Sequence, residues 1–358
     1  MTHPRVKTAI RCVLDHPLSR MMTTRMGIAV LVGGATCMPA TAQPVADFYR
    51  GKTISLLVGS GEGGGFDLSG RLTAQFLNRY IPGNPTIVVQ NMPGASGLRV
   101  AEYIYNIAPR DGTVIAITQP SIVQHKVVNP LARFNPVDYT WIGRLGSFVT
   151  YGVVWHTAPA QTVEQAKSKE LILGAVGPSG PGAMLPAALN RLAGTKINIV
   201  KGYKSAAELG LAMERGELHG SGSSSWEYVH SKGWLDKKLA KMLFTIGLSR
   251  SHYVPDVPTV VELATDERGK NVMRLAASAS EIGRAILAPP GLAAERADGL
   301  RQAFGQMVKD PEFLAESTRR NLDVEPLPAN DILKIVSDAM NMSADVVEAT
   351  RAIMDTEK

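Results

Sequence analysis

The chain has 358 residues, long enough for two domains of ordinary size, and carries 38 lysines and arginines against 32 aspartates and glutamates. Most of the basic excess lies in the first 42 residues, and the other 316 residues hold 33 basic and 31 acidic side chains. The charges are thus nearly balanced, and no basic block is interleaved with aromatic residues. The charge pattern therefore gives no support for binding to nucleic acid.

The first 42 residues have the pattern of a secretory signal peptide. Basic residues precede the apolar run Met26–Val32, and Ala40-Thr41-Ala42 offers a small-x-small cleavage site. The apolar run is too short for a permanent membrane anchor, and translation could begin at one of the later methionines. Both cysteines lie in this segment, so the secreted chain would have no disulfide, thiolate metal site or cysteine nucleophile. We expect a bacterial periplasmic protein.

The central feature of the remaining chain is residues 54–80, ISLLVGSGEGGGFDLSGRLTAQFLNRY. An apolar run typical of a buried parallel strand is followed by a glycine-rich loop and then by apolar residues at helical spacing. Asp67 is expected to cap that helix. Glycines leave backbone N–H groups unshielded, and a helix start carries partial positive charge, so the loop is predicted to bind a carboxylate or phosphate. The candidate ligand-binding residues here are Gly63, Gly64, Gly65, Phe66 and Asp67.

Two other interpretations of this loop remain open. Gly59, Gly61 and Gly64 satisfy the G-x-G-x-x-G dinucleotide fingerprint. That fingerprint also needs an acidic residue at the end of the next strand, and the strand predicted at Thr86–Gln90 ends without one. Alternatively, the loop only connects the strand to the helix, although it has more glycines than a plain connection needs.

The elements that follow predict a parallel sheet. After the second strand come another glycine-rich loop (residues 91–97), a helix at Leu98–Ile107 and an apolar strand at Thr113–Thr118. Three strands alternating with two helices favour a parallel sheet, in which ligands bind beyond the carboxyl ends of the strands. Thr118 and Gln119 fall at that edge and are candidate ligand-binding residues.

A second unit of the same kind follows two β-like segments, Tyr139–Leu145 and Tyr151–Trp155. Its predicted strands are Leu171–Val176, Lys196–Val200 and Met242–Leu248, and its predicted helices are Ala183–Ala193 and Ala206–Arg215. Glycine- or serine-rich loops follow these strands, and the serine run at residues 221–225 is expected to be such a loop. From Ala293 onward the pattern is helical. The candidate ligand-binding residues of this half are Ser147, Ser179, Gly180, Tyr203, Ser223 and Trp226.

Six short motifs occur in a fixed order along the chain. They lie at Val58–Asp67, Val88–Gly97, Ala108–Gly112, Tyr203–Ala206, Pro255–Thr259 and Leu287–Gly291. Together they resemble the motifs of the Bug family, the periplasmic solute receptors of tripartite tricarboxylate transporters. Any one of them alone would not be specific.

The resemblance implies an α/β, two-lobed, type II periplasmic binding fold with a ligand cleft between the lobes. Residues 43–149 and 251–358, with the C-terminal helices, would form lobe 1, and residues 150–250 would form lobe 2. It implies a monomeric receptor without cofactor or enzymatic activity, which delivers a small organic carboxylate to membrane permease subunits. Backbone N–H groups and ordered waters would hold the carboxylate without any arginine. The alternative is an exported α/β enzyme or a dinucleotide-binding protein that uses the Gly59–Gly64 loop.

Departures from the family pattern bear on the ligand. Residues 60–62 replace Phe-Pro-Pro, and Phe66 stands where a small polar residue is usual. With Tyr203 and Trp226 from the opposite lobe, three aromatic side chains would face the cleft, which favours a hydrophobic or aromatic carboxylate over citrate. The alternative is that Tyr203 and Trp226 pack within their own lobe.

Other polar residues give no catalytic pattern. The histidines of the secreted chain show no metal-site spacing, and Ser96 and Ser179 lie in glycine loops outside a G-x-S-x-G context. His219 is singled out because it adjoins the serine run. Arg144 and Arg215 are expected at the surface.

Overall fold

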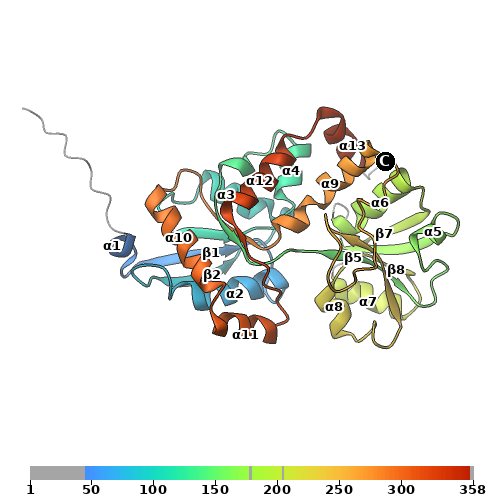
Figure 1. Ribbon diagram of the computed structural model, residues 1–358, viewed down its shortest axis with the longest axis horizontal. Coiled ribbons are helices and arrows are strands. Elements are labelled where there is room, and N and C mark those ends of the chain that lie inside the picture. Colours follow the sequence, from blue (N-terminus) through green and yellow to red (C-terminus); the bar gives the residue numbers. More distant parts are fainter. Residues whose placement is uncertain (1–44, 177–179, 204, 355–358) are drawn as a thin grey trace, which may run out of the picture. The chain divides into compact units, whose positions relative to one another are not determined.

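The computed structural model describes residues 45–176, 180–203 and 205–354, which fold into two mixed β-sheets covered by helices (Figure 1). Residues 42–358 form one compact unit. The signal peptide predicted for residues 1–42 lies outside the described residues. Within the described ranges, no helix combines the length and the apolar character needed to cross a membrane.

The first sheet has the strand order β11-β4-β10-β3-β1-β2. Its strands are β1 (Thr53–Val58), β2 (Thr86–Asn91), β3 (Val114–Ile117), β4 (Thr140–Arg144), β10 (Ala285–Ala288) and β11 (Leu327–Pro328). The pairs β1–β2 and β1–β3 are parallel, as the alternating pattern predicts, whereas β10 pairs antiparallel with both β3 and β4. The carboxyl ends of β1, β2 and β3 therefore meet at one edge, where the glycine-rich loops begin.

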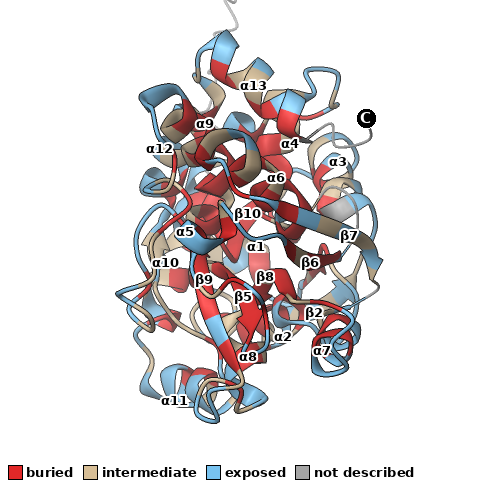
Figure 2. Cartoon of the chain, turned by 90° about the vertical axis from the view of Figure 1, so that its right-hand side faces the viewer, coloured by how far each residue is buried: buried red, intermediate tan, exposed pale blue. Residues whose placement is uncertain are grey.

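The second sheet has the order β7-β6-β8-β5-β9. Its strands are β5 (Thr150–Trp155), β6 (Leu171–Val176), β7 (Ile197–Tyr203), β8 (Gly220–Ser225) and β9 (Ala240–Ile246). Strand β6 is parallel to β7 and β8, and β5 is antiparallel to β8 and β9. Figure 2 shows that β5, β6 and β8 are largely buried, while the edge strand β7 is more exposed.

The α-helices connect and cover these strands. They are α1 (Val45–Tyr49), α2 (Gly65–Leu77), α3 (Leu98–Asn106), α4 (Ile122–Val128), α5 (Val163–Ala166), α6 (Pro181–Ala193), α7 (Ala206–Glu214), α8 (Trp226–Ser231), α9 (Glu267–Ile282), α10 (Ala294–Met307), α11 (Pro311–Arg319), α12 (Ala329–Met340) and α13 (Ala344–Met354). Two short 3-10 helices, at Ala95–Gly97 and Pro136–Asp138, lie between them.

The serine run is a strand, so the expectation of a loop at residues 221–225 was wrong. Strand β8 lies inside the sheet between β5 and β6, and helix α6 packs directly on it. A Cβ atom on Gly222 would lie 2.0 Å from the carbonyl oxygen of Gly182 in α6, and one on Gly220 would lie 2.0 Å from that of Val153. Small residues are needed there because neighbouring backbones approach closely.

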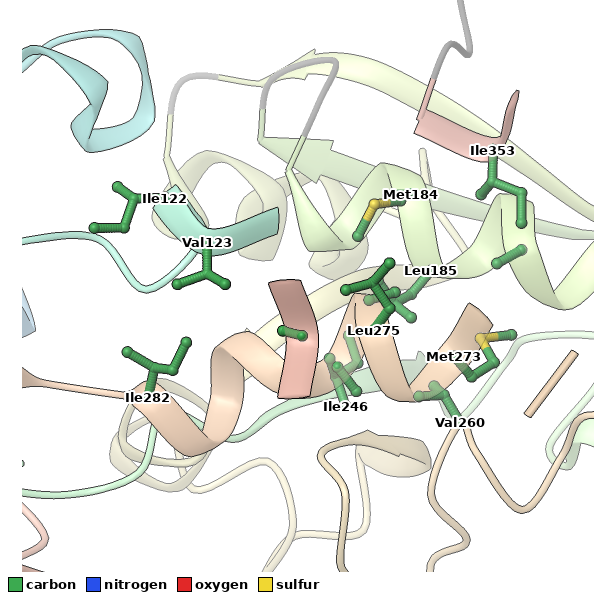
Figure 3. Packing of buried hydrophobic residues seen from close by; sticks show 14 of the residues in the cluster. Ile122, Val123, Met184, Leu185, Ile246, Val260, Met273, Leu275, Ile282 and Ile353 are labelled. Atoms are coloured by element: carbon green, nitrogen blue, oxygen red, sulfur yellow. The ribbon is translucent and has the colours of Figure 1, made fainter. Parts of the chain in front are cut away.

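One hydrophobic cluster extends over both sheets. It includes residues of β1, β3, β4 and β10 from the first sheet and residues of β5, β6 and β9 from the second. Figure 3 shows its central part, where α9 contributes Met273, Leu275 and Ile282 beside Leu185 of α6 and Ile246 of β9. Helix α9 also packs against α4, α12 and α13, so it connects helices of both halves of the chain.

Candidate functional site

A cavity lies at the carboxyl ends of β1, β2 and β3, as the parallel sheet predicts. It encloses about 300 Å³, and we call it the glycine-loop cavity. It is lined by Gly59, Ser60, Pro93, Gly94, Ala95, Gly97, Gln119, Ser121, Gln124, His125, Gly180, Pro181, Met184, Ala276 and Ala279. Loops of the first sheet and the start of α6 next to the second sheet thus share one cavity.

Close contact between the loops explains two of the glycines. A Cβ atom on Gly59 would lie 2.8 Å from Val100 Cγ1 of helix α3. Gly97 has a φ of +87° and would bring a Cβ atom to 2.7 Å from the Cβ of Gln119. A side chain at either position would push the loops apart, and the positive φ of Gly97 additionally disfavours other residues.

A buried amide gives the glycine-loop cavity a hydrogen-bond acceptor. The Gln124 side chain is 3% exposed, and its Nε2 donates to the Leu275 carbonyl at 3.2 Å and to Ser278 Oγ at 2.7 Å. These bonds fix the amide orientation, and Oε1 has no partner among the described residues. His125, in the same wall, has its pKa lowered by burial, which favours the neutral ring. The wall therefore offers hydrogen bonds more than fixed charge.

A second cavity lies at the other end of the same glycine loop. It encloses about 450 Å³ and is lined by Gly65, Phe66, Leu68, Phe148, Thr150, Pro181, Ala206, Ser223, Ser224, Ser225, Glu227, Arg284, Arg320, Asn321 and Leu322. We call it the arginine cavity. Pro181 lines both cavities, and the loop from Gly59 to Gly65 reaches from one to the other.

Asp67 fastens this loop rather than capping the helix. The N-cap of α2 is Gly64, and Asp67 lies inside the first turn. Its buried carboxylate accepts hydrogen bonds from the Gly63 amide at 2.9 Å, Asn91 Nδ2 at 2.8 Å and Arg71 Nε at 3.0 Å. Burial raises the pKa of Asp67, but these bonds outweigh it, and the pKa lies below its usual value. Because its oxygens are occupied, the role of Asp67 is structural, and the expected N-cap was wrong.

The other predicted site residues do not share one cavity. Gly65, Phe66 and Ser223 line the arginine cavity, and Gln119 and Gly180 line the glycine-loop cavity. Gly63 and Gly64 are exposed in the loop between the cavities, and Thr118 is buried at the end of β3. Ser147 and Trp226 line a third cavity of about 100 Å³. Ser179 lies outside the described residues.

The three aromatic side chains do not converge, so this part of the prediction was wrong. Phe66 is buried against Phe148, with ring centroids 5.2 Å apart. Trp226 stacks on Tyr253 at 4.2 Å, and Tyr203 packs against the hydrophobic cluster of the second sheet. Tyr203 follows the alternative interpretation and packs within its own lobe, whereas Trp226 stacks on Tyr253, a residue of the segment assigned to lobe 1 from the sequence.

Arg144, expected at the surface, is 7% exposed. Its guanidinium donates to the carbonyl oxygens of Glu281, at 2.6 Å, and Glu325, at 3.1 Å and 3.2 Å, so it joins the end of α9 to the segment before β11. Arg215 is exposed, as predicted. His219 accepts a hydrogen bond from the Ile172 amide at 3.0 Å, which gives it a structural role at the start of β8.

Arg284 is the residue that the sequence analysis missed. It immediately precedes β10, and its side chain is 4% exposed. Nη1 donates to the Ser147 carbonyl at 3.3 Å and Nη2 to Glu227 Oε1 at 3.2 Å, whereas Nε has no partner within the described ranges. The signal in the sequence is a single charged residue in the apolar run at residues 282–288. Buried arginines of this kind are uncommon unless a partner neutralises them.

Comparisons with known proteins agree with this architecture. No family model matches the chain. A curated protein of Cupriavidus necator, the UPF0065 protein in the gbd 5' region, is 26% identical over 349 residues, 94% of this chain and 97% of its own length.

Solved structures of similar fold include three with TM-scores between 0.60 and 0.64. A TctC solute binding protein from Polaromonas has 20% identity, covers 86% of this chain and 99% of its own, and gives a TM-score of 0.64. The periplasmic binding protein BugD has 16% identity, coverages of 85% and 98%, and a TM-score of 0.60. The R. palustris protein Rpa4515 with adipate has 20% identity, coverages of 84% and 97%, and a TM-score of 0.60. The predicted two-lobed periplasmic binding fold and the resemblance to Bug proteins are confirmed.

Proposed function

We propose that this chain is an exported receptor of the Bug family, which captures a small organic carboxylate between its two sheets. It would deliver the ligand to membrane permease subunits of a tripartite tricarboxylate transporter. The observation that carries the proposal is the glycine-loop cavity, to which loops at the carboxyl ends of β1, β2 and β3 and the start of α6 all contribute. Ligands of open α/β sheets bind at such an edge. The lobe boundaries proposed from the sequence fit the membership of the two sheets.

The cavity suits an acid with an apolar body. Met184, Ala276 and Ala279 give it an apolar wall. Gln124 Oε1, which has no partner among the described residues, can accept a hydrogen bond from a hydroxyl or amide group of a ligand but not from an ionised carboxylate. Since the aromatic side chains do not converge, ring stacking no longer favours an aromatic acid. The methylene chain of a linear dicarboxylate would fit this apolar wall, in keeping with the adipate of a structurally similar protein.

The dinucleotide alternative has less support. At the end of β2, where that fingerprint requires an acid, Asn91 donates from Nδ2 to Asp67 Oδ1 at 2.8 Å and to the Ser60 carbonyl at 3.1 Å. This amide is used to fasten the glycine loop. The end of β2 therefore has no carboxylate that could bind a ribose hydroxyl.

The test is a titration of the secreted chain, residues 43–358, with adipate, malate, citrate, benzoate and NAD. We expect a carboxylate to bind and to raise the melting temperature, because a ligand at 100 times its Kd adds about 2.7 kcal/mol of stability. Stabilisation by NAD with no response to any acid would contradict the proposal.

A variant tests whether the glycine loop takes part. At Gly64 a Cβ atom would enter open space, so Gly64→Val should keep the fold and obstruct the approach of a carboxylate to the loop amides. Gly61→Val is the matched control, because its Cβ atom also enters open space, whereas Gly61 does not adjoin the helix start, for which Gly64 is the N-cap. We expect weaker binding for Gly64→Val only. Equal affinities of both variants and the wild type would make the loop a plain connection.

A further inference from the structure

We propose that Arg284 and the first turn of α2 together bind one carboxylate group of the solute. The proposal deepens the proposed function and rests on it for the nature of the ligand. It also departs from the expectation that a carboxylate is held here without any arginine. The site it assigns is the part of the arginine cavity between Gly65 and the Arg284 guanidinium.

The start of α2 has no side-chain cap among the described residues. The helix has 13 residues and begins after Gly64, which has no side chain to accept a bond from the first amides. A Cβ atom on Gly64 would have no neighbour within 4 Å, so an acceptor can approach this turn. The Asp67 carboxylate does not fill the role, because its oxygens already bind the Gly63 amide and the side chains of Asn91 and Arg71. The partial positive charge of the helix start is thus available to a ligand.

The Arg284 guanidinium lies against this turn. A Cβ atom on Gly65 would lie 3.4 Å from Nη2 and 4.0 Å from Nε of Arg284. Nε is the guanidinium nitrogen without a partner among the described residues, and the side chain is 96% buried. The Nε–Nη2 edge of an arginine presents two parallel N–H groups, which match the two oxygens of a carboxylate.

Positive side chains outnumber negative ones in the arginine cavity, although Arg284 also lines the third cavity, whose acidic residues are Glu227, Glu281, Asp323 and Glu325. The ionisable residues lining the arginine cavity are Arg284, Arg320 and Glu227. Arg320 binds Glu316 and Gln75, and Glu227 makes a single contact with Arg284, at 3.2 Å. The guanidinium carbon of Arg284 lies 5.5 Å from the Phe148 ring centroid and 6.0 Å from that of Phe66. A charge pair formed beside these rings is screened less than one in water.

A purely structural role for Arg284 makes different predictions. In that case Glu227 is the essential partner of Arg284, and removing either side chain would lower the stability of the protein by a similar amount. If Arg284 binds the ligand, Glu227 competes with the incoming carboxylate, so Glu227→Gln should leave the affinity for an acid unchanged or increase it. The two interpretations therefore predict different outcomes for Glu227→Gln: a loss of stability like that of an Arg284 variant in the first case, and unchanged or tighter binding of an acid in the second.

The experiment compares the wild type with Arg284→Met, Arg284→Lys, Glu227→Gln and Gly65→Ala. Adipate binding is measured by calorimetry, and sulfate binding by thermal shift at constant ionic strength. We expect at least tenfold weaker binding of both anions for Arg284→Met, an intermediate loss for Arg284→Lys and no loss for Glu227→Gln. Gly65→Ala places a methyl group against the guanidinium and should weaken binding without lowering the melting temperature. Arg50→Met, at an exposed arginine of the α1–β1 loop, controls for net charge.

Wild-type affinity in both Arg284→Met and Gly65→Ala would overturn the inference. If Arg284→Met does not fold, Gly65→Ala and Glu227→Gln decide, and weaker anion binding in Glu227→Gln also counts against it. If the wild type binds no carboxylate but Arg284→Met still abolishes its response to sulfate, the anion site stands and the proposed solute class fails. If the wild type binds adipate and Arg284→Met binds it equally, the receptor function stands and this site fails.

Discussion

Asp67 shows how one side chain can build a site without contacting the ligand. It lies in the first turn of α2 and joins that turn to the preceding loop at Gly63 and to the end of β2 at Asn91. The glycines of the loop gain their fixed shape from these bonds, because glycine alone allows many conformations. The positions of the free amides at the helix start therefore depend on Asp67.

Asp67→Asn should destabilise the protein by about 2 kcal/mol, since it exchanges a buried acceptor for an amide that faces donors. The folded-state pKa of Asp67 is lowered, so its stabilising contribution is present above the unfolded pKa of about 4 and is lost as the pH falls through the folded value. The difference in unfolding free energy between wild type and variant should thus be constant near neutral pH and shrink in acid. Denaturant unfolding across this pH range measures it.

Asp47→Asn is the control for that series. Asp47 makes an exposed pair with Arg50 at 3.0 Å, and such pairs contribute little. We expect its unfolding free energy to stay within about 0.5 kcal/mol of the wild type. A pH-independent loss in Asp67→Asn would show that the carboxylate charge is not what fastens the loop.

The candidate site could be predicted in part at this scale. The density of glycines after β1 indicates where backbone amides are unshielded, and the cavities adjoin that loop. The role of Arg284 could not be predicted, because its partners Ser147 and Glu227 are distant in sequence. Trp226 was misplaced for a similar reason: its stacking on Tyr253 depends on tertiary packing.

At the scale of elements, strands with an apolar pattern were predictable and β8 was not. The runs at β1, β3 and β6 are apolar, and the structure has strands there. The sequence of β8, GSGSSS, has little intrinsic strand preference, because its residues are small and lack β-branching. Its strand conformation comes from pairing with β5 and β6 and from the close approach of α6.

The contact between α6 and β8 leads to a prediction about Gly222. Gly222→Ala would place its Cβ atom 2.0 Å from the Gly182 carbonyl oxygen, a backbone atom that cannot rotate away. We expect a loss of about 3 kcal/mol in unfolding free energy, at the upper end of overpacking costs. Thermal and denaturant unfolding measure this loss.

Gly305→Ala in α10 is the matched control, since a Cβ atom there meets nothing within 4 Å and the position is helical. It should stabilise the protein by up to about 1 kcal/mol. If Gly222→Ala were as stable as the wild type, helix α6 could not lie as close to β8 as the structure places it.

For the whole molecule, the sequence indicated two lobes but not how firmly they are joined. Two α/β units could be read from their alternating patterns, and each forms a sheet. One hydrophobic cluster extends over both sheets because helix α9 packs against α6, α12 and α13. These tertiary contacts leave no local sequence pattern, so they could not be predicted. A receptor built this way is expected to move around the ligand only as far as this shared core permits.

The shared core predicts one cooperative unfolding transition. Leu275 of α9 is fully buried in the cluster that includes residues of both sheets (Figure 3). Leu275→Ala should cost about 3 kcal/mol, the range for a leucine removed from a packed core. Because residues 42–358 form one compact unit, the loss should lower the protection of amides in β1 and β6 alike in hydrogen exchange under native conditions.

Leu211→Ala serves as the comparison, because Leu211 of α7 is 47% exposed and its truncation should change stability by less than about 0.5 kcal/mol. If Leu275→Ala lowered protection in only one sheet, or if two melting transitions separated, the sheets would unfold independently. In that case the cluster around α9 would not couple them. Equal loss of protection in both sheets would instead mean that a solute bound to either sheet stabilises the whole secreted chain.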